Sequence, residues 1–67
     1  MTLTEIESRV QAIRDMACDF ERAHSLEDKL WADVLEAISN EECECPKAEA
    51  AAMALTTRQI EFERWCA

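Results

Sequence analysis

The sequence contains no glycine. The phosphate-binding loop, the dinucleotide-binding fingerprint and the nucleophile elbow of hydrolases all require glycine at fixed positions, so none of the three is present. A glycine-free helical chain also offers few exposed backbone N–H groups for an oxyanion hole, which leaves a Cys66 and His24 pair without the surroundings that nucleophilic catalysis needs. The sequence therefore predicts a protein that is not an enzyme.

Basic residues are scarce, with 7 Lys and Arg against 15 Asp and Glu and a formal net charge of −8. This balance repels phosphate backbones, so nucleic acid is not expected as a partner. A small acidic protein can instead imitate nucleic acid and block a basic groove on another protein, although an ordinary solvated helical face is the commoner explanation of acidic charge.

Long hydrophobic runs are also missing, since no stretch approaches the ~20 apolar residues of a membrane span. The first residues, "MTLTEIESRV", are acidic and amphipathic, unlike the basic and then apolar start of a signal peptide. We therefore expect a cytoplasmic protein with no membrane partner, in which the four cysteines stay reduced.

What the sequence does contain is a high proportion of Ala, Glu, Leu and Ile, which mostly favour helices. The chain has 67 residues and one proline, so a single all-α domain over 1–67 is predicted. A chain this short buries only about 60% of the surface that its unfolded form exposes. Self-association or a partner would add to its stability.

Hydrophobic residues recur at alternating spacings of three and four, which places them in one narrow seam along a helix. The seam comprises Leu3, Ile6, Val10, Ile13, Ala17 and Phe20 and continues in phase through His24, Glu27, Trp31, Val34 and Ile38. Thr4 followed by Glu7 matches a capping box, in which each side chain satisfies a free N–H group at a helix start. These features predict one long or kinked helix over about 4–39.

The alternative is a second helix that begins at 24–25, because Ser25 followed by Asp28 also matches a capping box. A break there would leave almost no connecting residues and no glycine to turn the chain, so the single helix is favoured. Further apolar residues widen the face beside the seam, which indicates burial on more than one side: Leu26, Leu30 and Leu35.

The segment "SNEECECPK" interrupts the apolar pattern and predicts a loop over about 40–45. Pro46 suits a first helical turn, so a second helix is predicted over about 46–65, with a kink near Thr56. A helix over 4–39 would span ~54 Å and its partner only ~30 Å. We therefore expect a helical hairpin or a short helical bundle, with part of the long seam covered by a second copy in a homodimer.

The cysteines raise the question of zinc. Cys43 and Cys45 form a C-x-C pair in place of the usual C-x2-C, and Cys18 and Cys66 lie far from them in sequence. The spacing demands no metal, so no cofactor is predicted, and the simpler interpretation is two exposed loop thiols and two partly buried ones. A site that combines His24 with nearby acids or cysteines is kept as an alternative.

The predicted interaction cluster consists of five residues, His24, Glu27, Asp28, Arg64 and Trp65. His24 and Glu27 fall on the seam, where apolar side chains are expected, so something must face them. The candidates are their own copies in a second chain, or Arg64 from the returning helix. Trp65 is predicted to hold down the chain end, with the alternative that Arg64 and Trp65 contact a partner.

Two runs give the chain a resemblance to a known group. One is the His-Ser-x-Glu-Asp run that begins at His24, and the other is the closing run from Thr57 through Ile60, Phe62 and Arg64 to Trp65, Cys66 and Ala67. In these runs the chain resembles small helical proteins of unknown function that bacteriophages and prophages encode. The resemblance covers about the last two thirds of the chain and does not include the pair Cys43 and Cys45. It implies a phage origin and action in the host cytoplasm, and it supplies no activity.

Together these features predict a small acidic phage-type protein that acts by protein–protein interaction and modulates a host factor or a defence system. One alternative is a metal-binding module that uses His24 with nearby acids or cysteines. The other is a component of virion assembly or a scaffold.

Overall fold

The computed structural model describes residues 1–62 and residue 64 and contains three α-helices. The elements are α1 (Leu3–Asp15), α2 (Phe20–Ser39), α3 (Lys47–Leu55) and a 3₁₀ turn, η1 (Thr56–Gln59). No strand occurs in the described part of the chain, so the predicted all-α class and a short helical bundle are confirmed.

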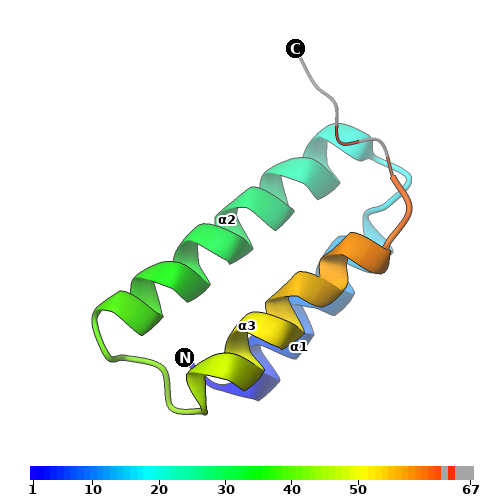
Figure 1. The fold of residues 1–67 in the computed structure, drawn as a ribbon. Coiled ribbons are helices and arrows are strands. Elements are labelled where there is room, and N and C mark those ends of the chain that lie inside the picture. Colours follow the sequence, from blue (N-terminus) through cyan, green and yellow to red (C-terminus); the bar gives the residue numbers. More distant parts are fainter. Residues whose placement is uncertain (63, 65–67) are drawn as a thin grey trace.

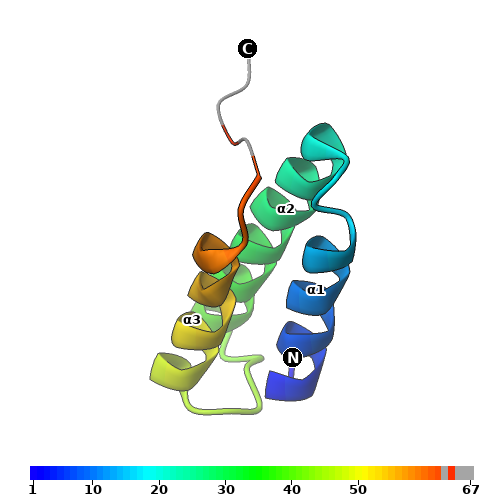
Figure 2. The ribbon, with the colours of Figure 1, turned by 90° about the vertical axis from the view of Figure 1, so that its right-hand side faces the viewer.

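The three helices pack side by side, and each contacts the other two. Figures 1 and 2 show that α2 runs in the opposite direction to α1 and α3, with the loop after α2 at the same end as the start of α1. The longest dimension of the molecule is 32 Å. A 20-residue helix such as α2 is about 30 Å long, which is close to this dimension.

The prediction of one helix over about 4–39 is wrong, and the alternative break at 24–25 is wrong as well. The first helix ends at Asp15, and the chain turns over Met16 to Asp19, where the Asp19 N–H donates to the Met16 carbonyl oxygen at 2.8 Å. Asp19 has an extended backbone, and its carboxylate accepts the N–H of Arg22 at 3.2 Å. Asp19 is therefore the N-cap of α2. Folding back at this point buries the apolar faces of α1 and α2 against each other, which supplies most of the stability of helices this short.

The first helix also begins earlier than predicted. The hydroxyl of Thr2 accepts the N–H of Glu5 at 3.1 Å, so Thr2 is the N-cap of α1 and Thr4 lies inside the helix. The pattern Thr-x-x-Glu occurs twice in succession here, and the sequence alone does not distinguish the two.

The core combines the predicted seam of α1 with a stripe on α2 that shares only Glu27 and Val34 with the predicted seam. Ile6, Val10 and Ile13 are buried, as the seam predicts for α1. In α2 the buried residues are Ala23, Glu27, Leu30, Val34 and Ala37. The predicted seam residues His24, Trp31 and Ile38 border this stripe and are half-buried, and Phe20 is 45% exposed. The buried face of α2 therefore differs from the predicted seam by one residue at three of its five positions and agrees with it at the other two.

The end of the predicted 46–65 helix is also different in the structure. The α-helix ends at Leu55, η1 continues to Gln59, and Ile60 is extended and buried. The change occurs at Thr56, where the sequence predicts a kink. The Thr56 hydroxyl donates to the Met53 carbonyl oxygen at 2.6 Å, and such side-chain bonds compete with the helical pattern. Beyond Ile60, the side chain of Arg64 reaches Glu27 on α2.

The loop between α2 and α3 lies close to its predicted range. Its first residues complete a Schellman motif, since the Glu41 N–H donates to the Ile38 carbonyl oxygen at 3.2 Å and the Glu42 N–H to that of Ala37 at 2.7 Å. Glu41 has a positive φ of 58°, a conformation that usually selects glycine. The chain has no glycine to place there, so Glu41 adopts this conformation at a cost.

Because α1 and α2 fold back on each other, the unequal arms of the predicted hairpin do not form. The argument for a homodimer, that part of a seam of ~54 Å would otherwise stay uncovered, therefore does not apply. A homodimer stays a prediction.

Within the described part of the chain, no helix combines the length and the apolar character needed to cross a membrane.

Candidate functional site

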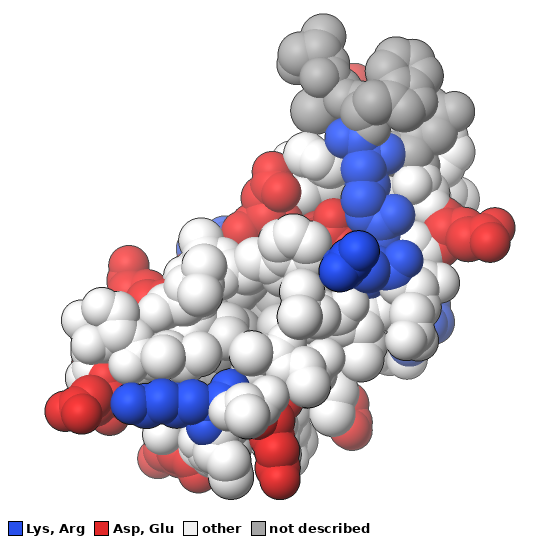
Figure 3. All heavy atoms as spheres, in the orientation of Figure 1, with Lys and Arg blue, Asp and Glu red and all other residues white. Residues whose placement is uncertain are grey.

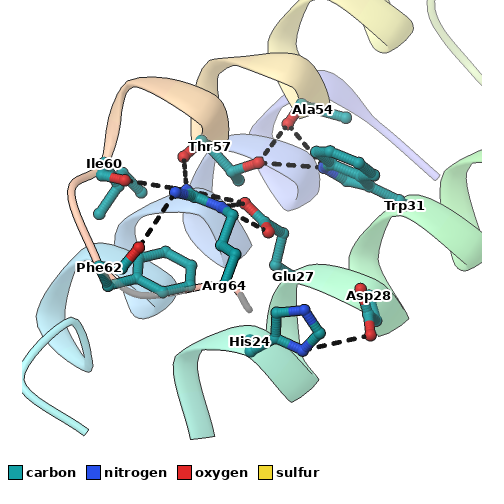
Figure 4. A network of polar contacts seen from close by, with 9 residues as sticks. All are labelled: His24, Glu27, Asp28, Trp31, Ala54, Thr57, Ile60, Phe62 and Arg64. Atoms are coloured by element: carbon teal, nitrogen blue, oxygen red, sulfur yellow. Dashed lines mark hydrogen bonds and ion pairs between the residues drawn. The ribbon is translucent and has the colours of Figure 1, made fainter. Parts of the chain in front are cut away.

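Glu27 and Arg64, two residues of the predicted cluster, contact each other directly (Figure 4). Glu27 lies on the buried stripe of α2 and is only 2% exposed. Arg64 Nε donates to the two carboxylate oxygens of Glu27 at 2.9 and 3.1 Å, and Arg64 Nη2 donates to Oε2 at 3.1 Å. The forked guanidinium therefore neutralises a carboxylate that has been removed from water.

Arg64 also binds the backbone that leads to it. Its Nη2 donates to the carbonyl oxygens of Thr57 at 2.6 Å and Ile60 at 2.9 Å, and its Nη1 donates to that of Phe62 at 3.4 Å. The guanidinium carbon lies 3.9 Å from the centre of the Phe62 ring, in a cation–π arrangement. Arg64 thus joins three carbonyl oxygens at and beyond the end of η1 to the buried carboxylate, and that of Thr57 also accepts the Ile60 N–H at 3.0 Å.

Trp31 and Thr57 continue the network towards α3 (Figure 4). The indole Nε1–H of Trp31 points at the Thr57 hydroxyl, 3.0 Å away, and at the Ala54 carbonyl oxygen, 3.2 Å away. The Thr57 hydroxyl in turn donates to Ala54 at 3.2 Å. These contacts join the middle of α2 to the end of α3, and among the described residues no buried side-chain N or O atom lacks a partner.

His24 and Asp28 lie one turn apart on α2, beside the network (Figure 4). Nδ1 of His24 is 3.4 Å from Oδ2 of Asp28, and the Asp28 side chain is mostly exposed. This is a helical i, i+4 pair in which Asp28 faces solvent and His24 is half-buried, whereas Glu27 faces the core. The remaining member of the predicted cluster, Trp65, lies outside the described residues.

The exposure of the described cysteines differs from the predicted exposure. Cys18 is exposed, not partly buried, while Cys43 and Cys45 are half-buried against the core, not exposed. Cys66 lies outside the described residues, and so does any site that would use it. Within residues 1–62 and 64, no group of three or more His, Cys, Asp or Glu side chains could hold a metal ion.

An apolar groove between α2 and α3 was not among the predicted sites. It has a volume of about 180 Å³ and is lined by Trp31, Val34, Leu35, Ile38, Ala51, Ala54 and Leu55. Two of its leucines protrude, since Leu35 is 68% and Leu55 47% exposed. Figure 3 shows uncharged side chains over the middle of this face, with charged side chains at its margins. The sequence predicted burial for the widened face of Leu26, Leu30 and Leu35. Leu30 is buried and Leu26 half-buried, but the prediction is wrong for Leu35, which is exposed at the groove.

A second hollow lies between α1 and α3 and has a different character. Its volume is about 800 Å³, and most of its lining residues are polar or charged, among them Glu7, Gln11, Arg14 and Asp15. The α2–α3 groove is therefore the apolar one of the two.

Among family models, curated proteins and solved structures, none matches this chain.

Proposed function

We propose that this chain is a phage-type binding protein that acts stoichiometrically on a host protein, and that the α2–α3 groove receives an amphipathic helix of that partner. The observation that supports the proposal is the groove itself, with Leu35 68% exposed and Leu55 47% exposed at its two walls. Large aliphatic side chains that protrude beside an apolar hollow gain free energy when a partner covers them.

The dimensions of the groove favour a helix as its occupant. On α2 its lining residues extend from Trp31 to Ile38, which is two helical turns or about 10.5 Å. A helix laid along this length presents apolar side chains at i, i+3 or i+4, and i+7. The small residues Ala51 and Ala54 on the α3 wall allow such a helix to approach closely.

The charge of the chain favours a basic partner. A net charge of −8 on 67 residues attracts positively charged molecules and speeds their association. Both acidic and basic side chains reach the margins of the face in Figure 3, so the preference rests on the net charge and not on one edge. The expected occupant therefore carries an apolar stripe flanked by Lys and Arg.

A synthetic peptide tests the groove without knowledge of the natural partner. The probe is an 18-residue helix with leucines in one stripe and lysines elsewhere, and its control has the same composition in scrambled order. We expect the striped peptide to bind, and Leu35→Gln to weaken binding by about tenfold or more through loss of buried apolar surface. Titration calorimetry at physiological salt measures both.

Phe20→Gln is the matched control, because Phe20 is also an exposed large apolar residue on α2 but does not line the groove. It should leave peptide binding unchanged. Equal binding of the striped and scrambled peptides, or equal loss with the two substitutions, would mean that charge alone attracts the peptide and would overturn the proposal.

A second copy of this chain is the rival occupant. Light scattering on the wild-type protein and on Leu35→Gln separates the two. The expected result is the same oligomeric state in both, because the predicted homodimer would then form through a surface other than the groove. A wild-type dimer that Leu35→Gln converts to a monomer would assign the groove to self-association, and would favour a role in virion assembly over binding of a host protein.

A further inference from the structure

Cys43 and Cys45 bring two sulfur atoms together in the loop between α2 and α3. Their Sγ atoms are 3.0 Å apart, and Sγ of Cys43 also lies 3.3 Å from the carbonyl oxygen of Cys45. Both side chains are half-buried and pack against the core, so one side of the pair stays accessible to solvent. The two thiols are thus neighbours in space and within reach of a small reagent.

The backbone around the pair is held in place. Glu44, the residue between the two cysteines, donates its N–H to the Met1 carbonyl oxygen at 2.8 Å, and the amino group of Met1 donates to the Glu42 carbonyl oxygen at 2.7 Å. The Schellman motif at Glu41 fixes the start of the same loop. Contacts with Met1 and with the end of α2 therefore hold the backbone that places the two sulfur atoms close together.

The two thiols have different acidities. A hydrogen bond from the Cys45 thiol lowers the pKa of Cys43, and the nearby positive charges of the N-terminus and Lys47 act in the same direction. The same hydrogen bond, together with burial, raises the pKa of Cys45 to about 11. Cys43 is accordingly the thiol that ionises first, and Cys45 keeps its proton.

We propose that Cys43 and Cys45 form a redox-active dithiol that exchanges with low-molecular-weight disulfides, with Cys43 as the attacking sulfur and Cys45 as the resolving one. This inference is independent of the groove and of the binding function proposed above. The pair lies in the loop after α2, and none of the groove-lining residues belongs to it.

The exchange takes two steps. The Cys43 thiolate attacks one sulfur of the disulfide, its S–S bond breaks, and one thiolate leaves and takes up a proton, so that a mixed disulfide remains on Cys43. Cys45 then loses its proton to solvent and attacks Sγ of Cys43, which releases the second thiol. Two electrons pass from the dithiol to the small disulfide, and the chain gains one Cys43–Cys45 bond.

Oxidised glutathione is the probe, and mass spectrometry under acid quench follows the products. The starting protein is the full chain with Cys18→Ser and Cys66→Ser, so that the pair reacts alone. We expect loss of two hydrogen atoms with no retained glutathione. In this background Cys45→Ser should accumulate glutathione on Cys43. Cys43→Ser should react more slowly, because burial and the nearby Glu49 carboxylate still raise the pKa of the thiol that remains.

Circular dichroism of each variant controls for folding, since serine is close to cysteine in size. A chain that retains only Cys18 provides the rate for a single exposed thiol. Stable glutathione on Cys43 of the intact pair would contradict a resolving role for Cys45. Equal rates for the two single variants, or a rate for the pair no faster than that of Cys18, would overturn the proposal.

Discussion

At one end of the bundle, Arg64 closes the structure by binding the buried carboxylate of Glu27 and three backbone carbonyl groups. At the other end, the loop after α2 closes it through backbone bonds to Met1, two adjacent thiols and a residue in the left-handed region, Glu41. Both ends join the same helices, but they depend on different interactions.

The two ends should differ in how much stability the protein loses when one side chain is removed. A buried carboxylate without its guanidinium is an uncompensated charge in a region of low dielectric, so the Arg64 end depends on a single side chain. The loop end shares its contacts among several weak bonds and contains a backbone conformation that costs free energy. We therefore expect the Arg64 end to be sensitive to substitution and the loop end to tolerate or even benefit from it.

The largest effect is expected for Arg64→Ala. It leaves Glu27 buried and unpaired, which should lower the free energy of unfolding by about 3 to 5 kcal/mol. Urea denaturation followed by circular dichroism measures the loss. The double variant with Glu27→Leu removes the stranded charge and should be more stable than Arg64→Ala alone. If the losses of free energy from Arg64→Ala and Glu27→Leu simply added in the double variant, the buried carboxylate would not depend on Arg64.

Trp31→Phe should have a smaller effect at the same end. It keeps the apolar ring but removes the N–H that points at Thr57 and Ala54, which should cost about 1 to 1.5 kcal/mol. Trp31 also lines the groove, but phenylalanine keeps an apolar ring there, so peptide binding should change less than it does with Leu35→Gln. Thermal unfolding together with the peptide titration separates these effects, and an unaltered stability would show that the indole N–H contributes nothing.

Glu41→Gly should act in the opposite direction, at the loop end. Glycine adopts the positive φ of this position without a steric penalty, so the free energy of unfolding should rise by about 0.5 to 1 kcal/mol. The control is Glu42→Gly, because among the described residues only Glu41 has a positive φ. Glu42→Gly should be neutral or destabilising. Equal changes from both would point to charge removal as the cause.

The smallest effect is expected at an ion pair that belongs to neither end. Arg9 Nη1 of α1 lies 2.9 Å from Oδ2 of Asp33 on α2, and Lys29 lies 3.4 Å from the same oxygen. The hydrogen bond from Arg9, with a smaller contribution from Lys29, lowers the pKa of Asp33. Since both partners are partly exposed, Asp33→Asn should destabilise the protein far less than Arg64→Ala does.

The pH dependence of the Asp33 effect follows from the direction of that shift. A pKa lowered in the folded state stabilises the protein above the unfolded value of about 3.9, and this contribution disappears as the pH falls through the folded value. The difference between wild type and Asp33→Asn should therefore be present near neutral pH and vanish in acid. High salt should reduce it too. A difference that persisted in acid would assign the effect to packing.

Helix content was predictable from the sequence because it depends on local preferences. The composition indicated an all-α chain, the segment around Pro46 marked the loop, and the apolar spacing identified the buried face of α1. The turn at Met16 to Asp19 was missed because the apolar period continues through it and it contains neither glycine nor proline. Asp19 caps α2 there, but an aspartate within an acidic chain is an ambiguous signal.

The candidate site, too, was predictable in part from the sequence. Glu27 stood out in the sequence because an acid on an apolar stripe needs a partner, and Arg64 was one of two partners considered. The sequence also contained the C-x-C spacing and the extra leucine at position 35. Which partners surround these residues depends on contacts between segments that are 23 to 41 residues apart in sequence. Local sequence patterns do not specify such contacts.

The sequence by itself determined that the chain forms helices, is acidic, and contains a carboxylate at a position that must be buried. Tertiary structure alone decided that α1 and α2 fold back on each other, that Arg64 of the same chain reaches Glu27, and that an apolar groove stays open between α2 and α3. The reason is physical: helix formation depends on neighbouring residues, whereas burial of a charge or exposure of a leucine depends on which distant surface covers it.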